Sequence, residues 1–533
     1  MFVRPRMFCV AALIAPLCAC APSQEGPDQC KNANVDLLAT ADAKYLDLPE
    51  AEGGLSAATR DAIDGAVQAF MSAHETPIAG CALAVARRDR IAYLQGYGLA
   101  DAGDDNPETI DRLRAFTIAT PAPIGSISKT LTALGLMVYV QQNGLSLDDP
   151  LLDQMGLQPG SDVGWTGNPT LRQVLAHQGG FSDDYPLWDD DAFHDGPTIA
   201  AAFPNVERPG LHPLLVFQGY KTQAGNQNVA QIGTAVYSNV GYSLLGALLD
   251  YRTRDAGTPA HMQGYERFIW HTVARGPNLT GPSMISACLA TDFRTKDIKN
   301  LASGYTESGT PKGFGDSDSV GWGWEGPSGG WAMTIGDLGR LMLILQSSAV
   351  VDKGLIDTEM RATNGPLFGE VDAGLGLELD ANGQWFGKGG DILGYTADMK
   401  IWPSANGESW GVAFLCNQRN AGKSLTGDVY DVLAGRSPVG GTGRGSGVQP
   451  QTQAPPDPTT VTLVKRYEPV VRAYAARYLA DGASPEQAWA RARRDLARLP
   501  NGPQLVQAVE RGEFDAALRL LPTMPQANTV TTR

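Results

Sequence analysis

The stretch GSISKTLTALGLMVYVQQNG, residues 125–144, combines a helix pattern with two reactive side chains. Its apolar residues recur at helical spacing and Gly144 follows them, so we predict a helix that begins at Ser126 and ends just before Gly144. Ser126 and Lys129 would then lie one turn apart on the same helix face. The backbone N–H of Ser126 would lie at the positive end of the helix dipole, which stabilises a developing oxyanion.

A lysine removed from water can act as the base that a serine hydroxyl needs to become a nucleophile. The Ser-x-x-Lys pair alone is weak evidence, because it recurs by chance and because Ser126 by itself could simply cap a helix. A second motif, Tyr237-Ser238-Asn239, places a phenol and an amide side chain just before an apolar helix.

A third motif, Lys388-Gly389-Gly390, follows a strand-like segment at residues 384–387. It places a cation before glycines that let a substrate approach the backbone. Taken singly, Tyr237 would more often be a core residue and Lys388 a surface residue. The three motifs together favour an acyl-transfer site.

Six blocks that include these motifs resemble the serine β-lactamase and penicillin-binding protein superfamily, nearest its class C and esterase-like branch. They occur in the family's order between residues 60 and 435: GSISKTLTAL with GLSLDDPL, TLRQVLAHQGGFSD, VYSNVGYSLLGALL, PSGGWAMTIGDLGRLM, AGLGLEL and GKGGDILGYTADMKIWP. The resemblance implies an α/β (α+β) fold of the β-lactamase/transpeptidase type, in which an antiparallel sheet is flanked by helices beside an all-helical region.

The resemblance also implies roles for the first two motifs. Ser126 would be the acylated nucleophile and Lys129 would accept its proton. Tyr237 would pass the proton to the leaving group and later activate water. Asn239 would hold the amide carbonyl of the substrate. The family implies no metal and no organic cofactor.

For the third motif, the resemblance implies that Lys388 sets the local potential and binds anionic parts of the substrate. The backbone N–H of Asp391, three residues further on, would complete an oxyanion site with that of the nucleophile. Gly389 and Gly390 are expected to line the substrate. β-Lactam recognisers of the family usually have a hydroxyl residue where this chain has Gly389, which weakens the β-lactamase interpretation. Many esterase-like relatives have His in place of Lys388.

The acidic segment FSDDYPLWDDDAFHD, residues 181–195, could attract an amine-bearing substrate if it lay near the site, although a solvated loop is the commoner role of such a run. The sequence Gly326-Pro327-Ser328-Gly329-Gly330 matches the nucleophile elbow of α/β-hydrolases. That elbow needs a strand before the serine and a histidine after it, and no histidine follows this serine. We therefore exclude an α/β-hydrolase elbow.

The overall composition excludes some function classes. The 533 residues include 42 basic and 57 acidic side chains, a net charge of −15, which argues against a nucleic-acid partner. The 43% of hydrophobic residues predicts a sizeable core. No Cys-x-x-Cys pair or His-rich cluster indicates a zinc site. We expect a small-molecule or peptide substrate, and the oligomeric state is left open.

The first residues indicate export. Arg4 and Arg6 precede an apolar run at residues 7–19 that is too short to span a bilayer and is typical of a signal peptide. The run ends in a sequence that resembles a lipoprotein box with Cys20 as the lipidated residue, and ordinary cleavage to a soluble exported protein is the alternative. We expect the cell envelope or periplasm, with membrane contact through the lipid anchor only.

The chain divides into five parts by composition. We predict a signal peptide (1–19), a tether (20–55), the serine hydrolase domain (56–435), a Gly/Pro/Gln-rich linker (436–458) and a small C-terminal helical appendage (459–533). The appendage has a net charge of +4, so it could dock on acidic partners or lipid headgroups, or it could be only a solvated helical unit.

Four cysteines lie beyond the leader: Cys30, Cys81, Cys288 and Cys416. Four cysteines allow three full pairings, and buried free thiols are at least as common an outcome. The family's strand order, however, places the first strand of the domain antiparallel to the strand at residues 412–415. The resemblance therefore implies that Cys81 and Cys416 lie close together, within the Cα separation of about 7 Å that a disulfide needs.

We conclude that the protein is an exported serine hydrolase acting on an ester or amide through an acyl-serine intermediate, similar to an esterase or a D-amino-acid peptidase/amidase. One alternative is a β-lactamase or DD-carboxypeptidase acting on β-lactams or peptidoglycan peptides. The other is a non-catalytic envelope binding module with the same fold, which would not need Ser126, Lys129 and Tyr237 together.

Overall fold

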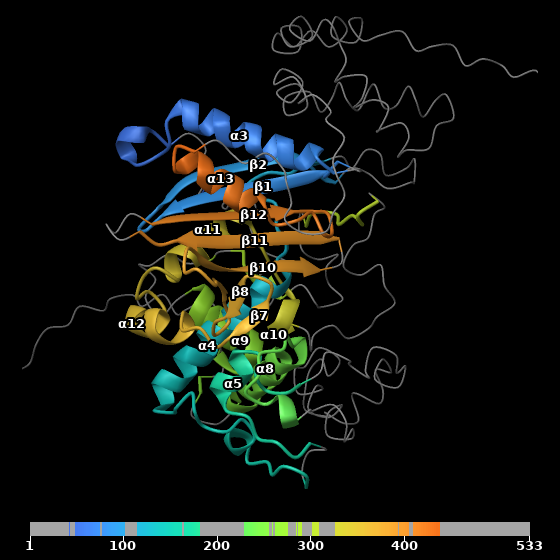
Figure 1. Ribbon diagram of the computed structural model, residues 1–533, viewed down its shortest axis with the longest axis vertical. Helices are drawn as coiled ribbons and strands as arrows, with labels where there is room; N and C mark the ends of the chain where they lie inside the picture. Colours follow the sequence, from blue (N-terminus) through green and yellow to red (C-terminus); the bar gives the residue numbers. More distant parts are fainter. Residues whose placement is uncertain are drawn as a thin grey trace, which may run out of the picture.

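A large antiparallel sheet forms one half of the computed structural model, and a group of helices forms the other half (Figure 1). The structure describes residues 42, 48–74, 77–101, 114–161, 165–181, 229–254, 258–259, 262–275, 284, 286–289, 301–308, 326–392, 394–404 and 409–436. Over these residues the fold is of the β-lactamase/transpeptidase type, as the sequence predicts.

Nine of the described strands make up the large sheet, and three more make up a small one. The order in the large sheet is β3 (Arg114–Ala115), β2 (Ile91–Asp101), β1 (Gly80–Arg87), β12 (Trp410–Cys416), β11 (Tyr395–Trp402), β10 (Phe386–Ile392), β9 (Glu378–Asp380), β8 (Val371–Ala373) and β7 (Pro366–Phe368). The order in the small sheet is β4 (Ala122–Pro123), β6 (Trp331–Met333) and β5 (Cys288–Leu289).

The described α-helices cover the two faces of the large sheet and build the helical half. They are α3 (Ala57–Ser72), α4 (Ser128–Asn143), α5 (Leu171–Leu175), α8 (Asn239–Thr253), α9 (Tyr265–Ile269), α10 (Gly326–Gly329), α11 (Ile335–Ile344), α12 (Lys353–Leu355) and α13 (Leu425–Leu433). None of these helices is both long and apolar enough to cross a membrane.

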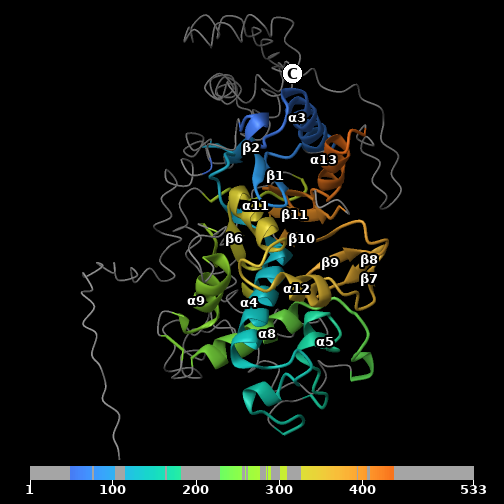
Figure 2. The same ribbon diagram turned by 90° about the vertical axis from the view of Figure 1, so that its left-hand side faces the viewer.

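Successive side chains of strand β1 point to opposite faces of the sheet, and those on both faces are buried. Cys81, Leu83 and Val85 pack in a cluster with residues of α3 and α13, whereas Ala82 and Ala84 pack in the main core with residues of α11. In Figure 2, α3 and α13 lie on one side of the sheet, and α11 and α4 lie on the other. The small alanine side chains leave room for α11.

The pairing of the first and last strands brings two cysteines together. In the register of β1 and β12, Cys81 lies opposite Cys416, and the two form a disulfide with a Cα–Cα distance of 4.0 Å. The pairing that the family resemblance implies is therefore confirmed. Cys288 is disulfide-bonded as well.

The folded domain begins earlier than the sequence predicts. Leu55, within the predicted tether, is 5% exposed and packs beside α3, whose first turn is capped by the Ser56 hydroxyl. Asp42 is buried and forms an ion pair with Arg340 of α11. At least part of the predicted tether therefore belongs to the fold, because its apolar and charged side chains have partners there.

Several predicted parts of the chain fall outside the described residues. They are the signal peptide (1–19) with Cys20, the linker from residue 437 onward, the helical appendage (459–533) and the acidic segment beyond Phe181.

Candidate active site

The nucleophile lies in a tight turn just ahead of a buried helix. Ser126 is the middle residue of the short 3₁₀ helix η3 (Gly125–Ile127), and α4 begins only at Ser128. The predicted start of the helix is therefore two residues early, because a 3₁₀ turn continues the apolar spacing of the helix that follows. The residue before α4, Ile127, makes no side-chain cap, so the alternative that Ser126 merely caps the helix is wrong.

Lys129 is completely buried, and its ammonium group contacts three oxygen atoms. Its Nζ lies 3.0 Å from Ser126 Oγ, 2.6 Å from Asn239 Oδ1 and 2.7 Å from the backbone carbonyl of Ser328. Ser328 belongs to the segment that the sequence analysis excluded as a nucleophile elbow. Its part in the site is a backbone acceptor, which no sequence motif could indicate.

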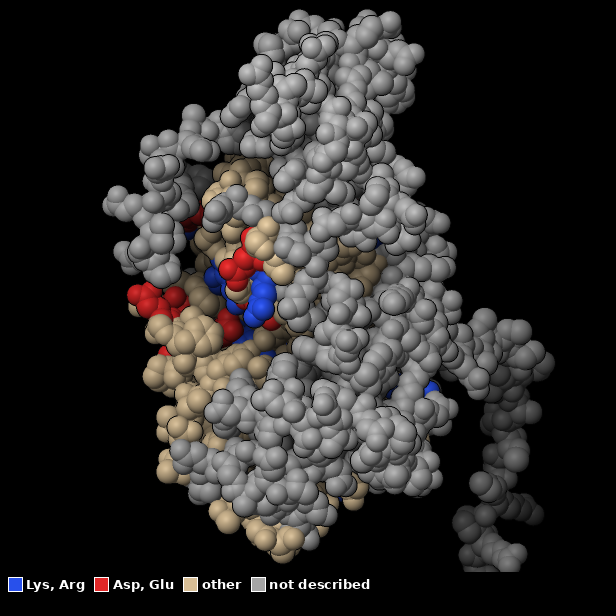
Figure 3. Space-filling view, turned by 90° about the vertical axis from the view of Figure 1, so that its right-hand side faces the viewer, with Lys and Arg blue, Asp and Glu red and all other residues tan. Residues whose placement is uncertain are grey.

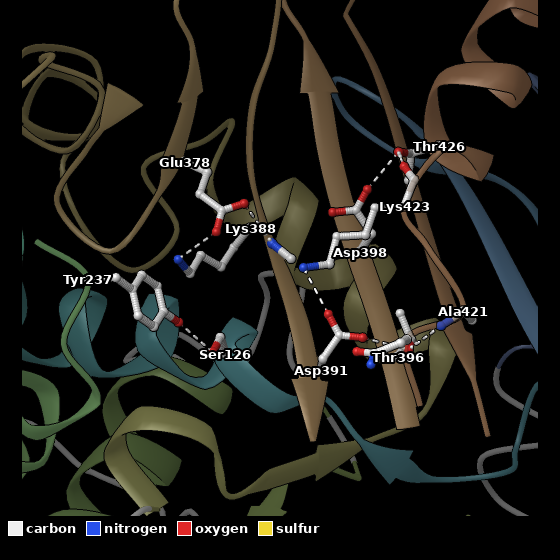
Figure 4. A network of polar contacts seen from close by, with 12 residues as sticks. Ser126, Tyr237, Glu378, Lys388, Asp391, Thr396, Asp398, Ala421, Lys423 and Thr426 are labelled. Carbon is white, nitrogen blue, oxygen red and sulfur yellow. Dashed lines mark hydrogen bonds and ion pairs between the residues drawn. The ribbon is translucent and has the colours of Figure 1, made fainter. Parts of the chain in front are cut away.

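Tyr237 meets the nucleophile from the loop before α8. Its hydroxyl oxygen lies 2.6 Å from Ser126 Oγ, as Figure 4 shows. The Nζ atoms of Lys129 and Lys388 lie 4.8 Å and 5.0 Å from the centre of the Tyr237 ring. Both lysine side chains therefore lie beside the face of the Tyr237 ring.

The ring of His177 packs against the ring of Tyr237. The sequence analysis did not assign His177 a role. Its ring stacks on that of Tyr237 with centroids 4.5 Å apart, and its Nδ1 accepts the backbone N–H of Ser238 at 3.1 Å. Burial, together with the charges of Lys388 and Lys129, lowers the pKa of His177 well below its usual value. The imidazole is therefore neutral, which leaves Nδ1 able to accept that hydrogen bond.

Strand β10 runs directly past the nucleophile, and two glycines make this approach possible. A Cβ on Gly390 would lie 2.0 Å from the carbonyl oxygen of Ile124 and 2.8 Å from Ser126 N. A Cβ on Gly125, which has a φ of 51°, would lie 2.9 Å from Asp391 N. The β10 backbone around Asp391 therefore packs directly against the turn that holds Ser126, and the oxyanion site formed by their two N–H groups stays a prediction.

Lys388 has an internal partner that the sequence analysis missed. Its Nζ donates to Glu378 Oε1 at 2.8 Å, while the backbone N–H of Gly389 donates to Glu378 Oε2 at 3.2 Å. Burial raises the pKa of Glu378, but Lys388 and Lys423 outweigh it, and the net pKa is lowered. Lys388 is 1% exposed. An anionic part of the substrate that binds Lys388, as the sequence analysis predicts, would therefore have to share it with the Glu378 carboxylate.

The side chain of a second lysine, Lys423, lies beside Gly389, where the family usually has a hydroxyl residue. Lys423, which follows β12, pairs with Asp391 Oδ2 at 3.0 Å. A Cβ on Gly389 would lie 2.6 Å from Lys423 Nζ. A threonine or serine at position 389 would therefore have to displace the flexible end of this lysine.

The assembled groups fit acyl transfer. A serine hydroxyl, two groups able to exchange its proton, and converging backbone N–H groups are the parts that formation of an acyl-serine requires. In the described part of the chain, no group of three or more His, Cys, Asp or Glu side chains could hold a metal ion.

The fold and these groups define a serine hydrolase. The family model described as Beta-lactamase matches residues 63–435, and the chain belongs to this family. No curated protein matches the chain in sequence.

Solved structures share the fold at low sequence identity. The octameric penicillin-binding protein homologue from Pyrococcus abyssi is 20% identical, with a TM-score of 0.52, over 70% of this chain and 77% of that one. FmtA from Staphylococcus aureus is 15% identical, with a TM-score of 0.51, over 78% and 100%. The D-amino acid amidase from Ochrobactrum anthropi SV3, in complex with L-phenylalanine, is 18% identical, with a TM-score of 0.50, over 71% and 96%.

Proposed function

We propose that this protein is an exported serine hydrolase that cleaves esters or amides through an acyl-serine intermediate, in the manner of an esterase or a D-amino-acid amidase. The observation that carries the proposal is the double contact on Ser126 Oγ, which lies 3.0 Å from Lys129 Nζ and 2.6 Å from the Tyr237 hydroxyl. A non-catalytic binding module has no use for this arrangement.

The three contacts of Lys129 indicate how it would take the proton. A neutral amine has two N–H bonds and one lone pair. In the charged form, Nζ donates to Ser126 Oγ, Asn239 Oδ1 and the carbonyl of Ser328. In the neutral form, two N–H bonds can stay on Asn239 and Ser328, which frees the lone pair for the proton of Ser126. As Ser126 attacks the substrate carbonyl, the proton moves to Lys129, and the resulting ammonium keeps all three oxygen partners.

The remaining steps follow from the position of Tyr237. The tetrahedral intermediate places its oxyanion between the backbone N–H groups of Ser126 and Asp391. Tyr237 gives its proton to the leaving group and recovers one from Lys129, so the acyl-serine forms with no net change in protonation. In deacylation the same pair takes a proton from water as the water oxygen attacks the acyl carbonyl, and it returns that proton to Ser126 Oγ as the bond to the acyl group breaks and the acid leaves.

Apolar side chains near the site favour an apolar substrate group. Phe368 of β7 is 47% exposed, and its ring centre lies 6.3 Å from that of Tyr237. Val236, next to Tyr237 in the chain, is 39% exposed. An exposed aromatic side chain beside a reactive group can contact an apolar part of the substrate. An aromatic or branched substituent on the substrate suits this surface.

Export and a lipid anchor at Cys20 are part of the proposal, and they rest on the basic and apolar leader at residues 1–19. The disulfide between Cys81 and Cys416 supports an oxidising compartment. Mass spectrometry of the protein from the membrane fraction tests the anchor directly, because a diacylglyceryl group adds a defined mass to the peptide that begins at Cys20.

The catalytic proposal is tested with a p-nitrophenyl ester, a fluorophosphonate probe and the variant Ser126→Ala. Removal of the nucleophile should lower kcat/KM by about a thousandfold or more and abolish labelling by the probe. Ser146→Ala, at an exposed position after α4, is the matched control and should behave as the unmodified protein. Activity of Ser126→Ala within about tenfold of the unmodified protein would refute the assignment.

A further inference from the structure

Beside the nucleophile, one edge of β10 is paired with another strand over only part of its length. Strand β9 pairs with β10 only at Phe386 and Gly387, so the edge is open to other groups from Lys388 onward. In an antiparallel strand, the N–H groups of alternate residues point to the same edge. The N–H of Gly389 points to Glu378, so that of Asp391 points to the same side, toward the nucleophile.

The spacing along this edge relates Glu378 to the reacting carbonyl. Alternate residues of a strand lie about 7 Å apart. A substrate whose carbonyl oxygen is bound at Asp391 N–H therefore meets, about 7 Å further along the edge, the Gly389 N–H with the Glu378 carboxylate already on it.

The carboxylate lies on the leaving-group side. Tyr237 protonates the leaving group in the proposed mechanism, and Lys388 Nζ lies 5.0 Å from the Tyr237 ring. The same ammonium holds Glu378 Oε1 at 2.8 Å (Figure 4). A leaving group that extends past Tyr237 along β10 therefore approaches Glu378.

Each of the two lysines at this edge already has a carboxylate partner. Lys388 is paired with Glu378, and Lys423 is paired with Asp391 at 3.0 Å. Asp398, one strand further in, adds another buried acidic side chain near Lys423. In the described part of the face that Figure 3 shows, Lys and Arg side chains lie beside Asp and Glu side chains.

Resting on the function proposed above, we infer that Glu378 is a specificity-determining residue that fills the anion position beside the nucleophile with the protein's own carboxylate. The substrates are then esters or amides whose leaving group is neutral or cationic at this position. Leaving groups with a carboxylate there, as in penicillins and in peptides ending in a free D-amino acid, are rejected by like-charge repulsion and by the loss of both hydrogen-bond donors.

The test compares two N-benzoylglycyl thioesters that differ in one group of the leaving thiol, mercaptoacetate in one and mercaptoacetamide in the other. Each kcat/KM is divided by the rate of hydroxide-catalysed hydrolysis of the same compound, which removes the difference in intrinsic reactivity. The unmodified protein should prefer the amide by about tenfold or more, and Glu378→Gln should reduce that preference at least about tenfold. Glu370→Gln, the same change at an exposed position, is the control and should keep the full preference.

Two outcomes would overturn the inference. One is a preference for the amide thioester below about threefold in the unmodified protein. The other is an unchanged preference in a Glu378→Gln protein that has a normal melting curve. If that variant does not fold, the unmodified protein is assayed with the N-benzoylglycyl thioester of thiocholine, whose leaving group is cationic. Its corrected kcat/KM should be at least that of the mercaptoacetamide thioester, and a value as low as that of the mercaptoacetate thioester contradicts the inference.

The same assay separates this inference from the proposed function. If the unmodified protein hydrolyses both thioesters without a preference, and Ser126→Ala abolishes this hydrolysis, only the role of Glu378 is refuted. Hydrolysis of neither thioester, together with no fluorophosphonate labelling, refutes both.

Discussion

Replacement of His177 by asparagine tests how strictly the fold keeps this imidazole neutral. His177 has a φ of 60°, a conformation that asparagine adopts more readily than most residues. An asparagine Oδ1 also offers an acceptor to the N–H of Ser238 in place of Nδ1. The variant therefore removes the titrating ring and its stack on Tyr237 and leaves the local backbone requirements satisfied.

The sign of the pH effect follows from the lowered pKa of His177, which burial causes first and Lys388 and Lys129 reinforce. The unfolded chain takes up a proton on this ring near pH 6.5, whereas the folded protein does not, so acidification favours unfolding. From roughly pH 7.5 to roughly pH 5, this difference amounts to about 2 kcal/mol when the folded pKa lies below that range. The loss is absent in the asparagine variant.

Urea-induced unfolding of both proteins, followed by circular dichroism across this pH range, measures the effect. At neutral pH the variant should be the less stable protein, because the aromatic stack is gone. As the pH falls, the gap in unfolding free energy should narrow by about 2 kcal/mol. All other groups titrate in both proteins and cancel in the difference. A gap that stays constant would show that folded His177 binds its proton as readily as the unfolded chain does.

Three other predictions concern stability, substrate binding and the tail. A double replacement of Cys81 and Cys416 by alanine should cost about 2–5 kcal/mol, seen as a lower melting temperature, and an unchanged melting curve would contradict this. Phe368→Ala should raise KM for an aromatic ester roughly fivefold through lost apolar contact, with no change in melting temperature; an unchanged KM would place the substrate elsewhere. Truncation after Gly440 should leave kcat/KM for a small ester within about threefold, and a loss of activity or of cooperative melting would make the tail part of the fold.

Local patterns in the sequence were sufficient for the elements around the nucleophile. The apolar spacing after Ser126 and the glycine at position 144 predicted α4, which ends at Asn143 and is capped by Gly144 with a φ of 63°. Sequence spacing also predicted that Ser126 and Lys129 would meet, because three residues make about one helical turn.

The groups that set the electrostatics of the site could not be predicted in this way. Glu378, Lys388 and Lys423 lie on three different segments and meet only because β9 pairs briefly with β10 and the chain returns beside it after β12. Their contacts depend on strand register, to which a single sequence gives no access. One departure was visible in the sequence, since Gly389 stands where the family usually has a hydroxyl residue, and in the structure Lys423 lies beside it.

The disulfide joins the first strand of the domain to its last, and the proposed catalytic residues from Ser126 to Asp391 lie between Cys81 and Cys416 in the sequence. That stretch is a covalently closed ring. A protease that cuts once anywhere inside it yields two fragments that stay attached through sulfur, each still paired with its neighbours in the sheet. In a compartment rich in proteases, such a nicked enzyme would keep its residues in register, and only reduction would separate the two pieces.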